Sequence, residues 1–182
     1  ALLHGLDGVI RAVGEGLENY DYATGLAALD RFFVGTFCDD WLETIKARLN
    51  EPQRFGTRPA AQATLWEALR DILGLYAPYL PFITETLWQR LYRPHEGGVS
   101  LHVTRFPEAR GVAAAPEMEA VGEVLRVVRQ ARTEARLPQS RELAWLEVPE
   151  RYRGLEPTLL AACRARELRF GEAVDLAFVE VA

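Results

Sequence analysis

The sequence predicts a mainly α-helical protein, in which an antiparallel helical bundle is followed by a small α/β subdomain. Apolar residues recur at three- and four-residue intervals through the first half of the chain, which is the period of amphipathic helices. Short connections between these segments favour an antiparallel bundle. After Gly97-Gly98 the pattern changes to short runs bounded by turn residues, which favours strands. We therefore expect a helical-bundle domain at 1–107, a linker rich in small residues at 108–116 and an α/β subdomain at 117–182.

The bundle should contain four helices, each with its own boundary signals. We place them at 2–17, 22–49, 59–76 and 81–91. Asp21 is a favourable N-cap for the second helix, whose broad apolar stripe indicates contacts on more than one side. Pro59 suits the first turn of the third helix. Pro78 and Pro81 then interrupt the helical pattern, because each proline removes a backbone donor and restricts the residue before it.

The second half of the chain mixes extended and helical patterns. The expected elements are an extended segment at 100–106, a helix at 118–136, a strand at 143–148, a short helix at 155–162 and strands at 167–170 and 177–181. Short strands interleaved with helices predict the small α/β subdomain.

Composition excludes several classes of protein. The chain has 182 residues and is 49% apolar, which is typical of a soluble globular domain. No apolar run approaches the ~20 residues that a membrane-spanning helix needs. The first residues show no secretory signal pattern, and the missing initiator Met suggests a processed product or a fragment. Cys38 and Cys163 stand alone in the sequence, which suggests a reducing compartment, so we expect a cytoplasmic protein.

The charge pattern leaves a nucleic-acid ligand open. The formal net charge is −5, which does not favour such a ligand. Lys46 is the only lysine, and the other twenty basic residues are arginines. Arginine binds phosphate bidentately and stacks on bases, although a GC-rich genome would give the same bias. Local patches decide RNA binding, and net charge does not.

The sequence contains no evident catalytic, metal or cofactor site. Its three histidines lie far apart, with no partner at metal-ligand spacing. The glycine-rich motifs that bind nucleotide phosphates are absent. Asp39, Asp40 and Glu43 lie beside Lys46, and we interpret them as a solvated, salt-bridged helix face. We therefore expect no enzyme activity and no cofactor in this chain.

The helix expected at 118–136 carries a row of arginines. Arg126, Arg129, Arg132 and Arg136 are spaced three, three and four residues apart, so they fall within about one third of the helix circumference. The adjoining apolar face consists of Val121, Val124, Leu125, Val128, Ala131 and Ala135. Such a helix could dock on a core and present a guanidinium stripe to an RNA backbone. In the alternative interpretation, these arginines pair with nearby carboxylates.

The end of the second expected helix is a further candidate RNA contact. It carries Trp41, Lys46 and Arg48, and Arg54 follows in the next loop. A basic helix end beside an aromatic ring and a loop suits unpaired bases, which can splay out and stack. Alternatively, Trp41 belongs to the core, and the two cations stabilise the helix C-terminus without any ligand.

Five short motifs follow one another in a fixed order. They are Y-D-Y-A-T-G-L at 20–26, F-C-D-D-W-L-E-T-I-K-A-R-L at 37–49, A-P-Y-L-P-F-I-T-E-T-L-W at 77–88, S-L-H-V-T-R-F-P at 100–107 and V-R-Q-A-R-T-E at 128–134. Together they resemble the anticodon-binding domain of class I aminoacyl-tRNA synthetases of the valine type, in its archaeal-like form. The isoleucine type is the next most similar. The resemblance covers about residues 1–148.

The resemblance implies a function. In this family the helical bundle holds the anticodon stem-loop, while a separate catalytic domain with two ATP-binding motifs joins the amino acid to tRNA. Those motifs are absent here, so ATP would bind in the parent enzyme and not in this chain. The implied partners are tRNA, expected to be tRNA(Val), and a catalytic domain of the same polypeptide. A free-standing protein-interaction module with this fold is the alternative. The candidate tRNA-binding residues are Lys46, Arg48, Arg54, Arg105, Arg129, Arg132 and Arg136.

Overall fold

The protein divides into two compact units. The computed structural model describes residues 2–50, 58–114 and 116–179, without the side chains of 47, 48 and 116–119. The first unit comprises residues 1–39 and 57–114, and the second comprises 40–56 and 115–182. No described helix is long and apolar enough to cross a membrane.

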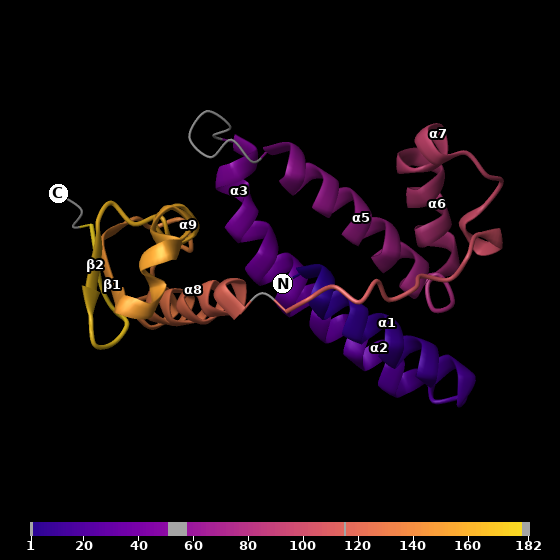
Figure 1. Cartoon of the computed structure of the whole chain (residues 1–182), viewed down its shortest axis with the longest axis horizontal. Helices are drawn as coiled ribbons and strands as arrows, with labels where there is room; N and C mark the ends of the chain where they lie inside the picture. Colours follow the sequence, from indigo (N-terminus) through magenta and orange to yellow (C-terminus); the bar gives the residue numbers. More distant parts are fainter. Residues whose placement is uncertain (1, 51–57, 115, 180–182) are drawn as a thin grey trace. The chain divides into compact units, whose positions relative to one another are not determined.

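The first unit is a bundle of helices (Figure 1). Its elements are α1 (Leu2–Glu18), α2 (Tyr22–Arg31), α5 (Arg58–Tyr76), α6 (Pro81–Leu91), α7 (Arg93–Glu96) and the 3-10 turn η2 (Leu101–Val103). Helix α1 packs against α2 and α5, and α5 packs against α6. A tight turn joins α1 to the antiparallel α2, in which the Asp21 side chain accepts a hydrogen bond from the backbone N–H of Thr24 at 3.2 Å. The predicted antiparallel bundle is confirmed.

Helix α2 continues into a π-helical segment, η1 (Phe32–Trp41), and then into α3 (Leu42–Asn50). A single α-helix was expected over 22–49, so the helical state was predicted and the wider winding was not. Within η1 the rings of Phe33 and Phe37 stack with centroids 5.9 Å apart, and Phe33 also meets the Tyr76 ring edge-on. The Tyr76 hydroxyl donates to Asp30 Oδ1 at 2.7 Å. These contacts hold the start of the π-helical segment against α5.

Two glycines permit the close approach of α1 and α2. A Cβ on Gly25 would lie 3.3 Å from Val13 Cα and 3.1 Å from the Tyr79 hydroxyl. A Cβ on Gly16 would lie 2.8 Å from the backbone oxygen of Asp21. The backbones therefore meet where no larger residue fits, which explains the glycine at each position.

The carboxylate of Glu85 fixes the segment that begins at Ser100 by two hydrogen bonds. Glu85, on α6, accepts hydrogen bonds from the Ser100 hydroxyl at 3.0 Å and from the Leu101 backbone N–H at 2.9 Å. The Ser100 oxygen also caps η2 by accepting from the N–H of His102 at 3.1 Å. The expectation of an extended segment at 100–106 is wrong for 101–103, because these caps favour a helical turn.

Residues 104–114 run without regular structure along the bundle and are anchored to α1. The buried carboxylate of Asp7 accepts hydrogen bonds from the backbone N–H groups of Arg110 and Val112, each at 2.9 Å. His4 Nδ1 lies 2.7 Å from the Val112 carbonyl oxygen. Part of the segment predicted as a linker is therefore bound to the bundle.

The second unit combines helices with a three-stranded sheet. Besides α3, its elements are α8 (Pro116–Glu134), β1 (Leu143–Pro149), the 3-10 turn η3 (Glu150–Leu155), α9 (Glu156–Cys163), β2 (Leu168–Gly171) and β3 (Asp175–Phe178). The strand order is β2-β1-β3, with β1 parallel to β2 and antiparallel to β3. The small α/β subdomain is confirmed. The last strand begins two residues before the predicted 177–181.

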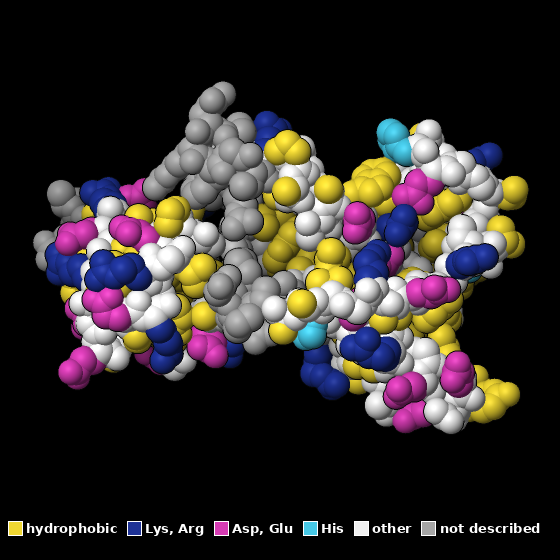
Figure 2. All heavy atoms as spheres, in the orientation of Figure 1, with side chains coloured by type: hydrophobic (Ala, Val, Ile, Leu, Met, Phe, Trp, Pro, Cys, Tyr) yellow, Lys and Arg dark blue, Asp and Glu magenta, His cyan; other side chains and the backbone are white. Residues whose placement is uncertain are grey.

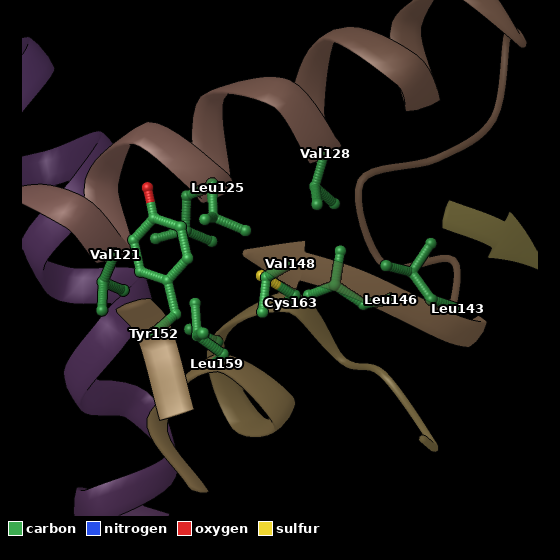
Figure 3. Close-up of a cluster of buried hydrophobic side chains, with 11 residues drawn as sticks. Val121, Leu125, Val128, Leu143, Leu146, Val148, Tyr152, Leu159 and Cys163 are labelled. Carbon is green, nitrogen blue, oxygen red and sulfur yellow. The ribbon is translucent and has the colours of Figure 1, made fainter. Parts of the chain in front are cut away.

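The core of the second unit lies between α8, α9 and the central strand. Figure 3 shows Leu125 and Val128 on α8 facing Leu146 and Val148 on β1, with Tyr152 beside them. All five side chains are buried. Leu146 pairs with Leu168 on one side and Leu176 on the other, which identifies β1 as the central strand.

Candidate nucleic-acid interface

The arginines of α8 do not form the predicted exposed stripe. Arg132 is only 3% exposed. Its guanidinium donates three hydrogen bonds to two backbone carbonyl oxygens inside the second unit. Nε and Nη2 reach the Arg141 oxygen at 3.1 and 2.7 Å, and Nη2 reaches the Cys163 oxygen at 2.7 Å. Its prediction as a phosphate contact is therefore corrected to a structural role.

The position of Arg132 on the helix explains its burial. At about 100° per residue, Arg132 lies only about 20° from Leu125 and about 40° from Val128 around the helix axis. It therefore shares the face that packs against the sheet. A buried guanidinium must place its N–H groups on acceptors, and the two carbonyl groups supply them.

The other α8 arginines differ from one another. Arg129 is half-buried, and its guanidinium pairs with Asp40 at 2.7 Å, which follows the alternative of carboxylate pairing. Arg126 and Arg136 are exposed and have no side-chain partner within the described part of the chain. Arg136 also adopts a left-handed backbone conformation, with φ of 55°. Their guanidinium groups are accessible, Arg126 on α8 and Arg136 just beyond its end at Glu134.

Lys46 lies in a small basic cleft of the second unit. The cleft has a volume of about 330 Å³ and is lined by α3, the end of α9 and the residues around the start of β1. Lys46 pairs with Glu43, as its three-residue spacing predicted. Arg164 and Arg166 line the same cleft, and sequence reasoning missed both. The side chain of Arg48 and the whole of Arg54 lie outside the described residues.

Arg105 lies in a second cleft, which belongs to the first unit and has a volume of about 360 Å³. Two further arginines line it and hold a buried carboxylate. Arg110 pairs with Asp71 at 2.6 Å, and Arg70 lies 3.5 Å from Asp71 and 3.5 Å from Glu96. Arg105 itself is exposed and has no side-chain partner among residues 2–50, 58–114 and 116–179. It is the cation of this cleft that is available to a ligand.

Basic and acidic side chains are interleaved on the surface. Figure 2 shows dark blue and magenta side chains alternating over the second unit and along the extended segment of the first. The face seen in this view has no broad patch of one sign of charge. On this face an anionic ligand would therefore be held by individual guanidinium groups.

The environments of the two cysteines disfavour thiol reactivity, and no metal site is formed among the described residues. Burial raises the pKa of the Cys163 thiol to about 12, so this thiol stays protonated and unreactive. Burial, followed by the charge of Asp39, also raises the pKa of Cys38. Among the described residues, no three His, Cys, Asp or Glu side chains gather in a way that could hold a metal ion.

Comparison with known proteins identifies the family. A family model described as the anticodon-binding domain of tRNA ligase matches residues 1–148. The chain belongs to this family of anticodon-binding domains. A valine–tRNA ligase of Haloarcula marismortui is 36% identical over 96% of the chain, and those of Methanopyrus kandleri and Thermobifida fusca are 34% and 35% identical over 88% and 89%. The chain spans about a fifth of the length of these relatives, at 19%, 18% and 19%.

Two motifs of the anticodon-binding domain meet in the structure. Glu85 belongs to P-F-I-T-E, and Ser100 opens S-L-H; the hydrogen bond between them joins residues fifteen positions apart. Gln89 donates to the same carboxylate at 2.7 Å. Burial raises the pKa of Glu85, but these hydrogen bonds outweigh it and lower the pKa below its usual value. The role of these residues in this chain is to hold η2 and the segment that carries Arg105.

Proposed function

We propose that this anticodon-binding domain recognises tRNA(Val) as part of a valine–tRNA ligase. The observation that carries the proposal is the match of 1–148 to the anticodon-binding family, together with valine–tRNA ligase relatives that cover up to 96% of the chain. In this role the domain supplies binding energy and orientation, and the amino acid is joined to tRNA elsewhere in the polypeptide.

The recognition chemistry rests on separate exposed cations. Arg105 and Arg136 present guanidinium groups without a carboxylate partner in the described residues, so they can bind phosphate oxygens bidentately. Lys46 lies in its cleft with one exposed carboxylate beside it. Arg48 and Arg54 remain proposed tRNA contacts, Arg48 because it lies in the family motif at 37–49 and Arg54 because it lies in the adjoining segment. Because phosphate contacts position an RNA without reading its sequence, these residues would set orientation more than identity.

Catalysis belongs to a different part of the proposed enzyme. We propose that a catalytic domain of the same polypeptide binds ATP and valine, and that the present domain binds neither. We place the enzyme in the cytoplasm, where tRNA is charged for translation. The domain would then act by raising the residence time and fixing the orientation of tRNA at a remote active site.

A salt titration of tRNA binding tests the proposal. Fluorescence anisotropy of labelled tRNA(Val) transcript with the 182-residue chain should show an affinity that falls linearly on a log–log plot against salt. Each neutralised phosphate contributes a slope of about 0.7 to 0.9. A tRNA(Ile) transcript and a tRNA(Val) transcript with an altered anticodon serve as controls and should bind less tightly. Absence of binding at low salt, or an affinity independent of salt, would contradict the proposal.

A further inference from the structure

The cleft around Lys46 gathers basic side chains from distant parts of the chain. Its polar lining consists of Lys46 and Asn50 on α3, Arg164 and Arg166 after α9, and the carboxylates of Glu43 and Glu142. Arg164 and Arg166 lie beyond residue 148, where the family match ends. The family match therefore includes Lys46 but neither of these two arginines.

Arg164 occupies a position that normally favours glycine. It ends α9 in the left-handed conformation, with φ of 54° and ψ of 44°. Residues other than glycine, asparagine and aspartate rarely adopt this conformation. Its guanidinium is exposed and lies 3.5 Å from the Ser140 oxygen, which is a long and weak contact. Packing therefore does not explain an arginine here, and its charge remains available.

The other two cations have carboxylate partners that water reaches easily. Lys46 pairs with Glu43, and Arg166 pairs with Glu142 at 2.8 Å. All four side chains are exposed, and ion pairs in this setting contribute little to stability. A phosphate that approaches Arg164 can thus recruit Lys46 and Arg166 by charge-assisted hydrogen bonds at small cost.

A buried arginine fixes the rim of the cleft. Arg132 binds the carbonyl oxygens of Cys163 and Arg141. Cys163 precedes Arg164, and Arg141 precedes Glu142, so one guanidinium holds the backbone on both sides of the cleft. The backbone that carries Arg164 is consequently fixed, which reduces the entropy lost when a ligand binds.

We propose that this cleft binds a phosphodiester of the tRNA backbone, with Arg164 as the principal ligand and Lys46 and Arg166 beside it. The inference rests on the proposed tRNA-binding function and adds a contact in the α/β unit. Three cations against two carboxylates favour an anion, and the open cleft admits a phosphate that lies along a polymer.

The decisive variant is Arg164→Gly. Glycine tolerates the left-handed conformation, so this variant should unfold at or above the temperature of the parent chain while it lacks the guanidinium. Its affinity for tRNA(Val) should fall about fivefold at moderate salt, and the log–log salt slope should become shallower by about one phosphate. Arg166→Ala added to it should weaken binding further.

Two comparisons separate a direct contact from a structural effect. Glu142→Gln releases Arg166 from its carboxylate and should strengthen tRNA binding by about twofold, with a steeper salt slope. Arg153→Ala is the matched control, because Arg153 is as exposed as Arg166, at 64%, is also paired with a glutamate and lies outside the cleft. Arg153→Ala should leave the affinity unchanged.

The outcomes distinguish this contact from the broader function. If the parent chain binds tRNA(Val) but Arg164→Gly binds with the same affinity and slope, the cleft is not an RNA contact and the proposed function stands. The cleft is likewise ruled out as a specific contact if Arg153→Ala weakens binding as much as Arg164→Gly. If the parent chain does not bind tRNA, both proposals fail together.

Discussion

The guanidinium of Arg132 donates a hydrogen bond of 2.7 Å to the carbonyl oxygen of Cys163, inside the core of the second unit. Burial lowers the pKa of Arg132, yet arginine stays charged because its ordinary pKa is so high. The side chain therefore acts as a charged crosslink between α8, the end of α9 and the approach to β1. An RNA ligand could reach it only by breaking that crosslink.

Loss of this crosslink should destabilise the second unit. Arg132→Met keeps an unbranched apolar stem but leaves two carbonyl oxygens without their donor, which should cost about 2 kcal/mol of unfolding free energy. Arg132→Lys keeps the charge and cannot reach both oxygens with a planar fork, so it should also be destabilised. Urea denaturation followed by circular dichroism measures both. Two variants as stable as the parent chain would show that these hydrogen bonds contribute nothing.

Asp7 should make the first unit sensitive to acid. Burial raises the pKa of Asp7, but hydrogen bonds from the Arg110 and Val112 backbone and the charge of Arg11 lower it by more, so it lies below the ordinary 3.8. A depressed folded-state pKa adds stability that is present above about pH 4 and lost as pH falls through the folded pKa. Asp7→Asn should therefore cost about 2 kcal/mol at pH 7.

The pH dependence supplies the control for Asp7. The difference in unfolding free energy between the parent chain and Asp7→Asn should stay constant from pH 7 to about pH 5 and shrink below about pH 4. Denaturant titrations at stepped pH values measure it. A difference that stayed constant down to about pH 2 would mean that the carboxylate charge is not what binds the segment at 110–112.

Arg105 should contribute to tRNA binding without contributing to stability. Arg105→Ala removes an exposed guanidinium that has no partner in the described residues, so the unfolding temperature should not change. The affinity for tRNA(Val) should fall several-fold, and the salt slope should drop by about one phosphate. Arg31→Ala, an exposed arginine at the end of α2 outside the cleft, is the control and should bind normally. Equal losses in both variants would argue against a specific role for Arg105.

Arg136→Gly should make the second unit more stable. Arg136 follows α8 with φ of 55°, and relieving a left-handed conformation at a non-glycine residue is worth about 1 kcal/mol. Differential scanning calorimetry should show a higher unfolding temperature. A lower temperature would mean that the arginine side chain contributes more by packing than its backbone conformation costs. The same variant should bind tRNA(Val) less tightly, because an accessible cation is lost.

Local sequence signals predicted the elements better than the contacts. The apolar period marked α1, and Pro81 marked the first residue of α6. The sequence did not predict the π-helical winding of η1, because Phe33 and Phe37, four residues apart, share a face in an α-helix and in a π-helix alike. The last strand begins two residues before the predicted start because its pairing with β1 extends to Asp175, which lies opposite Glu147.

The candidate site shows where reasoning from one helix at a time reaches its limit. Spacing grouped Arg132 with the other α8 arginines by charge, although its angle placed it beside Leu125 and Val128. That angle was available from the sequence, but it does not separate Arg132 from Arg136, which would also lie about 20° from Leu125 on a continuous helix. The two differ because α8 ends at Glu134, before Arg136. No local signal could have placed Arg164 beside Lys46, because the parallel β1–α9–β2 crossover and the packing of α3 on α9 create that proximity.

The anchoring of 110–112 by Asp7 has a consequence for dissecting the protein. A fragment that stopped at 107 would keep the described bundle helices but would strand a buried carboxylate without its two N–H donors. Such a truncation should give an unstable product. A fragment that extends past Val112 would retain both hydrogen bonds to Asp7. The practical limit of the helical module is therefore set by a stretch of backbone that carries no regular structure.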